Sequence, residues 1–303
     1  MIDYGTFYAE QAVMGFVVVG LVLLIYPIGV LKTGISKGLF WGLLIVNGVA
    51  PYLVRVGPGE ETLLLLSSGR QLHALSFMLL FACLLQQAPL RQTMPWFFWY
   101  VYALAFAHLF EVFLIDVLFS RDYTFVGPVS QYLSSRWGIR DFNFTAPINY
   151  LVKFVFLTLF FRAAINDPSI KKGYHYLLYG LVIFEIVQVI FFDSYQRYDS
   201  LSSTLKNSVI IGSVGLLLYR IYKHPSVSIS LTKNTYFWLC LGLLLPALSE
   251  LFLEFIFSIL YRTDLRQFYS LYLLRNSSQF VGYVLLMVGV WQAHYLRFLP
   301  SAY

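Results

Sequence analysis

The feature that most constrains this chain is a series of apolar stretches, each about twenty residues long, that recurs along its whole length. A helix of about 20 residues is long enough to cross the hydrocarbon of a bilayer, and a helix satisfies its own backbone hydrogen bonds there. The sequence is 59% hydrophobic and only 12% charged, which is about half the charged fraction of an ordinary soluble domain. The chain is therefore predicted to be an all-α protein, a polytopic bundle of transmembrane helices.

Nine spans are predicted, and they form a single transmembrane domain over residues 1–303, because no soluble domain, repeat or low-complexity tract interrupts them. Their approximate bounds are 10–31, 36–56, 71–89, 96–119, 147–165, 173–193, 202–222, 235–260 and 268–295. Gly57-Pro58-Gly59 breaks the chain before the third span. The apolar run from Leu63 to Leu66 is too short to cross a bilayer, so it is expected to form a re-entrant or interfacial turn.

The longest connection, 120–146, is predicted to lie on the extracytoplasmic side. Its apolar residues Val129, Tyr132, Leu133 and Trp137 are spaced as in a short amphipathic helix on the membrane surface, with Pro128 in its first turn. An irregular loop is the alternative for this segment.

Basic residues favour one orientation of the bundle. They are somewhat more frequent on the face that holds the C-terminus, once the long 120–146 connection is set aside. We therefore expect the N-terminus outside and the C-terminus in the cytoplasm of a multi-pass protein of the bacterial inner membrane or an equivalent membrane. The net charge of +6 reflects this topology, and no nucleic-acid partner is expected, because the Lys and Arg residues are scattered and not clustered in a soluble segment.

Ionisable and amide side chains inside the predicted spans are the main clue to function. A charge at the centre of a bilayer costs roughly 2.5–3.5 kcal/mol on insertion scales, so such residues persist where they are paired, hydrated or functional. In the predicted topology they share the half of the membrane nearer the outside, whereas the inner halves are nearly free of charge. The candidate binding residues are His108, Glu111, Lys153, Glu185, Glu250, Glu254, Arg275, Asn276 and Gln279.

The leading hypothesis is that the protein binds or moves a small polar solute or ion through an outward-facing pocket. In this hypothesis Arg275, Asn276 and Gln279 hold the solute, and the three glutamates of the candidate set on the sixth and eighth spans balance charge or carry a proton. The alternative is a non-catalytic subunit of a larger membrane complex, in which a pair such as Glu250–Arg275 only fixes helix packing. A further alternative is an intramembrane enzyme acting at the outer leaflet, with His108 and Glu111 as the acid–base pair.

Enzymatic and metal chemistry find little support in the sequence. No catalytic motif is present, and Cys83 and Cys240 lie in apolar runs that would not activate a thiolate. A metal is not expected, because only one helix carries a His/Glu pair at helical spacing, His108 with Glu111. The sequence identifies no cofactor, and its expected partners are the lipid bilayer, a small solute and other membrane subunits.

Small residues predict where helices pack closely. Ser278 and Gly282 share one face of the last span, and Ser208, Gly212 and Gly215 share one face of the seventh. Such spacing allows two helix backbones to approach each other closely.

Overall fold

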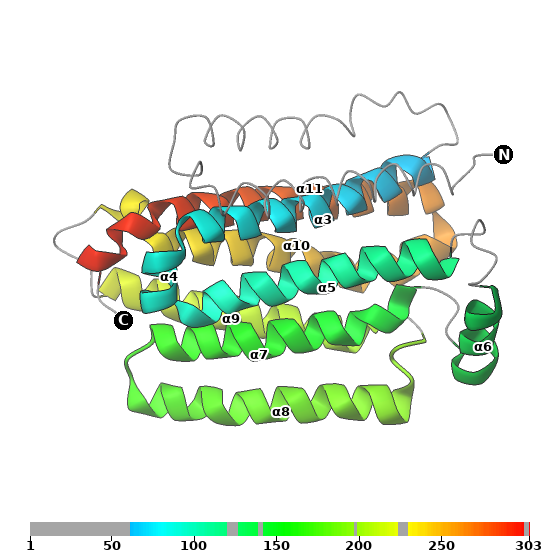
Figure 1. The fold of residues 1–303 in the computed structure, drawn as a ribbon, viewed down its shortest axis with the longest axis horizontal. Helices are drawn as coiled ribbons and strands as arrows, with labels where there is room; N and C mark the ends of the chain where they lie inside the picture. The colour runs from blue at the N-terminus through cyan, green and yellow to red at the C-terminus, as the bar shows by residue number, and fades with distance from the viewer. Residues whose placement is uncertain (1–60, 120–126, 139–141, 197–198, 224–229, 300–302) are drawn as a thin grey trace.

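The computed structural model describes residues 61–119, 127–138, 142–196, 199–223, 230–299 and 303, and every secondary-structure element among them is helical. The predicted spans 10–31 and 36–56 lie outside the described residues. Figure 1 shows the long helices lying side by side, with successive long helices running in opposite directions. The helices are α3 Glu61–Leu85, α4 Gln87–Thr93, α5 Pro95–Phe119, α6 Gly127–Trp137, α7 Ala146–Ala164, α8 Pro168–Phe192, α9 Ser200–Lys223, α10 Thr235–Thr263 and α11 Leu265–Trp291, with 3₁₀ helices at Phe142–Thr145, Leu231–Lys233 and Gln292–Phe298.

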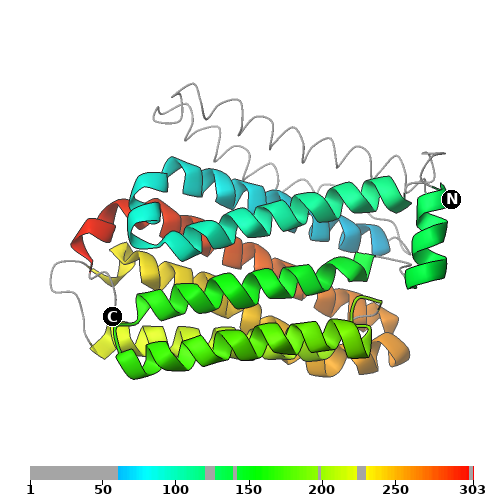
Figure 2. The ribbon, with the colours of Figure 1, turned by 60° about the horizontal axis from the view of Figure 1, so that its bottom comes forward.

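Six of the described helices close into a ring. Going round it, α3 contacts α5, α5 contacts α7, α7 contacts α9, α9 contacts α10, α10 contacts α11, and α11 returns to α3. Helix α8 packs against α7 on the outside of this ring, and α6 lies across one end of the bundle (Figures 1 and 2). The ring matters for function because side chains from six helices can meet inside it.

Four described helices are each long and apolar enough to cross a membrane, namely Ala146–Ala164, Pro168–Phe192, Ser200–Lys223 and the Thr235–Ile256 part of α10. A fifth span results if the bent pair α3–α4 is counted as one. Apolar faces that point outward from these helices, such as Ile183, Ile190 and Phe191 of α8, are those that lipid would cover. The prediction of a membrane-spanning helix bundle is therefore supported by the fold.

The region before the fourth predicted span differs from expectation. Leu63 to Leu66 do not form a separate turn, because they belong to the first turns of the continuous helix α3. The helix then ends at Leu85, and α4 leaves at an angle of 87°. Pro89 accounts for this break: it has no N–H to donate to the Leu85 carbonyl, and its ring would clash with that carbonyl in a continued helix. The predicted span 71–89 is thus a bent element.

The predicted short helix in the 120–146 connection is present as α6, which begins at Gly127 with Pro128 in its first turn and ends at Trp137. In α6, the side chains of Tyr132 and Trp137 lie on the surface and are not covered by other described residues. Gln196 donates from Nε2 to the Trp137 carbonyl over 3.1 Å, which ties the end of α6 to the connection between α8 and α9.

Glycines set a close helix contact between α10 and α11. A Cβ on Gly282 would lie 2.8 Å from the Gly242 carbonyl oxygen and would also collide with the ring of Pro246. At Gly212 and Gly215, by contrast, a Cβ would meet nothing within 4 Å. The small-residue face of the last span is therefore used for close packing, whereas the two glycines of α9 are not in close contact with a described neighbour.

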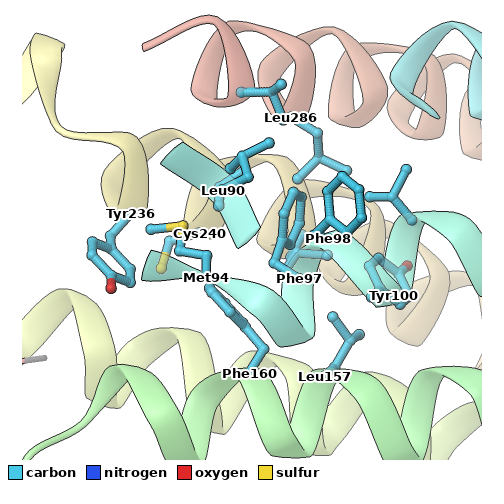
Figure 3. Packing of buried hydrophobic residues seen from close by; sticks show 14 of the residues in the cluster. Leu90, Met94, Phe97, Phe98, Tyr100, Leu157, Phe160, Tyr236, Cys240 and Leu286 are labelled. Atoms are coloured by element: carbon cyan, nitrogen blue, oxygen red, sulfur yellow. The ribbon is translucent and has the colours of Figure 1, made fainter. Parts of the chain in front are cut away.

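The end of the ring that holds α4 is filled with apolar side chains. Figure 3 shows Leu90, Phe97, Phe160, Tyr236 and Leu286 pointing toward one another from α4, α5, α7, α10 and α11. Each of these side chains is at most 5% exposed. A few buried polar side chains, such as Asn234 and Thr235 at the start of α10, also lie at this end.

Candidate functional site

A layer of polar side chains crosses the ring in its middle and in the half nearer α6, and we refer to it as the polar layer. Successive long helices run in opposite directions (Figure 1), so a residue in the first half of one helix can lie at the height of a residue in the second half of the next. Its members on the described helices are His73, Ser76, His108, Glu111, Asn149, Lys153, Glu185, Ser202, Lys206, Asn207, Glu250, Glu254, Arg275, Asn276 and Gln279.

Glu250 of α10 is the centre of the strongest electrostatic contact in this layer. Lys206 Nζ of α9 donates to Glu250 Oε2 over 2.5 Å, and the two side chains are only 6% and 8% exposed. Arg275 Nη2 lies 3.8 Å from Glu250 Oε1, and Gln279 Nε2 donates to the same oxygen. One carboxylate thus joins three helices through an ion pair that is largely removed from solvent. Arg275 and Gln279, which the sequence analysis assigns to a solute, are engaged by a protein carboxylate in this structure.

Lys153 of α7 occupies a different position. The described residues provide it with neither a hydrogen bond nor an ion pair, although its ammonium group interacts over longer distances with Lys206, Glu250, Arg275 and Glu111. A cation inside a spanning helix normally needs a counter-charge or water. Lys153 is therefore the cation of the layer that is best placed to meet an added anionic or polar group.

Glu185 anchors a second polar contact, between α8 and α9. Its side chain is fully buried, and its Oε2 accepts a hydrogen bond from Ser202 Oγ over 2.9 Å. Ser202 Oγ also lies 2.6 Å from Asp199 Oδ2, and Asp199 caps the start of α9 by accepting from the backbone N–H of Leu201 and Ser202. The other carboxylate oxygen, Glu185 Oε1, has no hydrogen-bond partner among the described residues.

Asn207 follows Lys206 on the buried face of α9. It is 1% exposed, and neither its amide nitrogen nor its amide oxygen finds a partner in the described part of the chain. A buried amide that makes no hydrogen bond costs roughly 1–3 kcal/mol, so such groups usually have an additional partner such as water, an ion or a ligand. Asn207 therefore adds unused hydrogen-bonding capacity one residue along α9 from Lys206.

The histidine cluster lies between α3, α5 and α7. His73 Nε2 is 3.9 Å from Glu111 Oε2, and the rings of His73 and His108 are 4.7 Å apart between centroids. His108 Nδ1 contacts Ser76 Oγ over 2.9 Å, and Asn149 Nδ2 donates to Glu111 Oε2 over 3.2 Å. The spacing of His108 and Glu111 on one helix is visible in the sequence, but the approach of His73 follows only from the packing of α3 against α5.

The remaining candidates lie at the edge of the layer. Asn276 is 5% exposed on α11, and Glu254 is partly exposed one turn beyond Glu250, where it interacts electrostatically with Tyr150. Ser76 and Ser202 were not identified from the sequence. Serine is common in membrane helices, so only their contacts with His108 and Glu185 distinguish them.

Helix ends outside the layer are fixed by ordinary capping. Asp167 precedes α8 and accepts from the backbone N–H groups of Ser169 and Ile170, and Arg220 donates to it over 2.9 Å. The Arg220 hydrogen bond, followed by the two backbone hydrogen bonds, holds the pKa of Asp167 below its usual value of 3.8. At the same end, Tyr303 exchanges backbone hydrogen bonds with the connection between α7 and α8, donating to Ala164 and accepting from Asn166.

Comparison with known proteins adds no assignment. Neither a protein-family model, nor a curated protein, nor a solved structure matches this chain.

Proposed function

We propose that this membrane protein binds a small polar solute or ion in the polar layer inside the helix ring, and that such binding serves uptake or movement of that solute. The single observation that carries the proposal is unused hydrogen-bonding capacity inside the helix bundle. The amide of Asn207 and the Oε1 of Glu185 are buried in spanning helices without a hydrogen-bond partner among the described residues. The ammonium of Lys153 interacts with its charged neighbours only through longer-range electrostatics.

Two residues of the layer, Lys153 and Asn207, favour a bound solute over a purely structural network. A structural network in a membrane is stable when its polar groups satisfy one another, because nothing else is available in hydrocarbon. Here one part is satisfied, around Glu250, whereas Lys153 and Asn207 are not. A ligand with both an acidic oxygen and a hydrogen-bond donor or acceptor would satisfy both, since Lys153 supplies a cation and Asn207 supplies a donor and an acceptor.

The role of Glu250 in this proposal is to reduce the positive charge of the layer. Lys206 and Arg275 both lie against its carboxylate, which compensates one of their two positive charges before any solute enters. Lys153 then remains as the charge available to a solute. A small carboxylate or phosphate-bearing molecule fits this arrangement better than a simple cation.

The proposal is tested by thermal stability of the purified protein in detergent, measured against a panel of small carboxylates, inorganic phosphate, amino acids and sugars. A ligand present at about 100 times its dissociation constant stabilises the folded state by about 2.7 kcal/mol. At least one anionic class is expected to raise the melting temperature of the wild type, and Lys153→Met and Asn207→Leu are expected to abolish that shift. Ser208→Ala is the matched control, because Ser208 is exposed on α9 and its hydroxyl donates to the Thr204 carbonyl of the same helix.

Two results would overturn the proposal. One is the absence of stabilisation by every member of the panel, and the other is a stabilisation that persists in both Lys153→Met and Asn207→Leu.

The second candidate is a non-catalytic subunit whose ion pairs fix packing. The observation that favours it is the saturation of Glu250, which three side chains from α9 and α11 engage at once. This candidate predicts that solubilisation in a mild detergent recovers the protein in a fixed stoichiometry with other membrane proteins. Recovery of the protein alone, with full stability, would exclude it.

We further propose the full topology of nine spans, with the N-terminus outside and the C-terminus in the cytoplasm of a bacterial inner membrane or its equivalent. Single cysteines test this orientation, because the native Cys83 and Cys240 are buried. Ser135→Cys in α6 is expected to react with a membrane-impermeant maleimide on intact cells, and Ser230→Cys only after permeabilisation. The opposite pattern would reverse the orientation.

A further inference from the structure

The histidine cluster of the polar layer has the composition and the supporting contacts of a metal site. His73 of α3 and His108 and Glu111 of α5 each offer one ligand atom, and these three atoms lie within 4.8 Å of one another. Two imidazoles and one carboxylate form the ligand set of many zinc and iron(II) sites, which leave further positions open for water or substrate.

The hydrogen bonds of Ser76 fix which nitrogen of His108 is available. Ser76 Oγ lies 2.6 Å from the carbonyl oxygen of His73, which can only accept, so the single hydroxyl proton of Ser76 points to that carbonyl. The contact of 2.9 Å between Ser76 Oγ and His108 Nδ1 must then be donated by the imidazole. Neutral His108 therefore carries its proton on Nδ1 and presents the lone pair of Nε2. A ligating histidine commonly donates its other ring N–H in this way.

Glu111 is oriented by a similar contact from a third helix. Asn149 of α7 donates from Nδ2 to Glu111 Oε2 over 3.2 Å, while Asn149 Oδ1 is buried and has no hydrogen-bond partner among the described residues. A carbonyl oxygen of this kind can serve as an additional oxygen ligand or can hold a metal-bound water. The cluster therefore has an oriented imidazole, an oriented carboxylate and an uncommitted oxygen.

We propose that His73, His108 and Glu111 bind a divalent transition-metal cation of intermediate softness, such as Zn²⁺, with Asn149 Oδ1 or water in the remaining position. This site is independent of the solute proposed above. Ligand atoms around a tetrahedral zinc ion are about 3.3 Å apart, given bond lengths of about 2.0–2.1 Å. The His73–Glu111 separation is 3.9 Å and all three ligand atoms lie within 4.8 Å of one another, so the ligands need to approach by at most about 1.5 Å to reach this geometry.

Lys153 is the neighbouring charge that opposes the bound cation. It interacts electrostatically with both His108 and Glu111 from α7. Removing its charge is therefore expected to raise the affinity for the metal, while leaving the ligands in place. A Lys153 variant without the charge should therefore bind metal more tightly, whereas a misfolded variant would bind it less tightly.

Metal binding is measured on protein purified in detergent through a tag that contains no histidine. Equilibrium dialysis against Zn²⁺ gives the stoichiometry, and titration with Co²⁺ reports the ligand geometry through its visible absorption. The wild type is expected to bind about one Zn²⁺ per chain and to give the intense Co²⁺ bands of a four-coordinate site. His108→Gln and Glu111→Gln are each expected to weaken binding by a hundredfold or more, and Ser76→Ala by about 10–100-fold, as for other residues that orient a ligand.

His175→Gln is the matched control, because His175 lies on α8 outside the cluster, with its ring against Tyr179. It is expected to bind metal like the wild type, and Lys153→Met is expected to bind more tightly. The proposal is overturned if the wild type binds no Zn²⁺. It is equally overturned if His108→Gln and Glu111→Gln retain wild-type affinity.

Discussion

Neutralising Glu250 is expected to destabilise the protein more than neutralising its main partner, Lys206. The Lys206–Glu250 contact of 2.5 Å corresponds to about 7 kcal/mol of Coulomb energy at an effective dielectric constant of about 20, and the Arg275–Glu250 contact of 3.8 Å to about 4 kcal/mol. Most of this attraction is offset by the cost of removing the charges from water. Deleting one partner of a buried pair nevertheless costs about 3–5 kcal/mol, because the other charge is left unpaired.

The asymmetry follows from the contacts of each residue. Glu250→Gln leaves Lys206, a side chain that is 6% exposed, with no other carboxylate in hydrogen-bonding contact among the described residues. The Glu250→Gln variant is therefore expected to lose about 3–5 kcal/mol of unfolding free energy, the range for a buried charge that is left without its partner. Lys206→Met instead leaves Glu250 in contact with Arg275 and Gln279. Its expected loss is about 1.5–3 kcal/mol, the range for a hydrogen bond to a charged group.

The double variant Lys206→Met/Glu250→Gln provides the decisive comparison. It removes both charges, so no buried ammonium remains, and it is expected to be more stable than Glu250→Gln alone by at least about 1 kcal/mol. Free energies of unfolding can be measured by titration of detergent-solubilised protein with sodium dodecyl sulfate, with tryptophan fluorescence as the signal. Glu254→Gln, one turn along α10 and partly exposed, controls for the loss of a carboxylate from the same helix.

Additivity would refute this reasoning. If the losses of the two single variants sum to that of the double variant within about 0.5 kcal/mol, the two charges do not depend on each other for stability. A Lys206→Met variant that is less stable than Glu250→Gln would contradict the argued role of Arg275 and Gln279.

Two further predictions concern packing and pH. Gly282→Ala is expected to destabilise the protein by about 1–3 kcal/mol, because its Cβ would collide with the Gly242 carbonyl and with Pro246. Gly212→Ala has open space around its Cβ, so it should be neutral or stabilising by up to about 1 kcal/mol. Equal effects of the two variants in thermal melts would contradict this difference. The depressed pKa of Asp167 stabilises the folded state above the usual value of 3.8, and this contribution is lost as the pH falls through the lower folded-state pKa. The melting temperature of wild type should therefore exceed that of Asp167→Asn at neutral pH, and the difference should shrink below about pH 4; a gap that stays constant down to pH 2 would rule out this linkage.

The helices themselves could be predicted from the sequence to within a few residues. The predicted spans 96–119, 147–165, 173–193 and 202–222 match α5, α7, α8 and α9, because hydropathy over about 20 residues is a direct signal for a helix in this class of protein. The exception is the region of α3, where a helix longer than its apolar core begins at Glu61. A proline four residues past a helix end, such as Pro89 after Leu85, could have been read as the cause of the break.

Nine members of the polar layer are candidate binding residues in the sequence, but their pairing could not be predicted. From the sequence, Arg275 is the expected partner of Glu250, whereas in the structure Lys206 lies nearer to its carboxylate. The pairing of side chains depends on which helices are neighbours and on how each helix is rotated about its axis. In a ring of six helices, short connections determine neither the neighbours nor the rotation. The same limit explains why His73, from a separate helix, did not enter the count of metal ligands.

Pro246 gives α10 a point of weakness close to its most connected side chain. Without an N–H at this residue, the Gly242 carbonyl lacks its usual intrahelical donor, and the helix bends there at lower cost than elsewhere. Glu250 lies one turn further on, so a change of angle at Pro246 swings the carboxylate away from Lys206 and Gln279 together. The angle of α10 at Pro246 is therefore coupled to the contacts that Glu250 makes with α9 and α11.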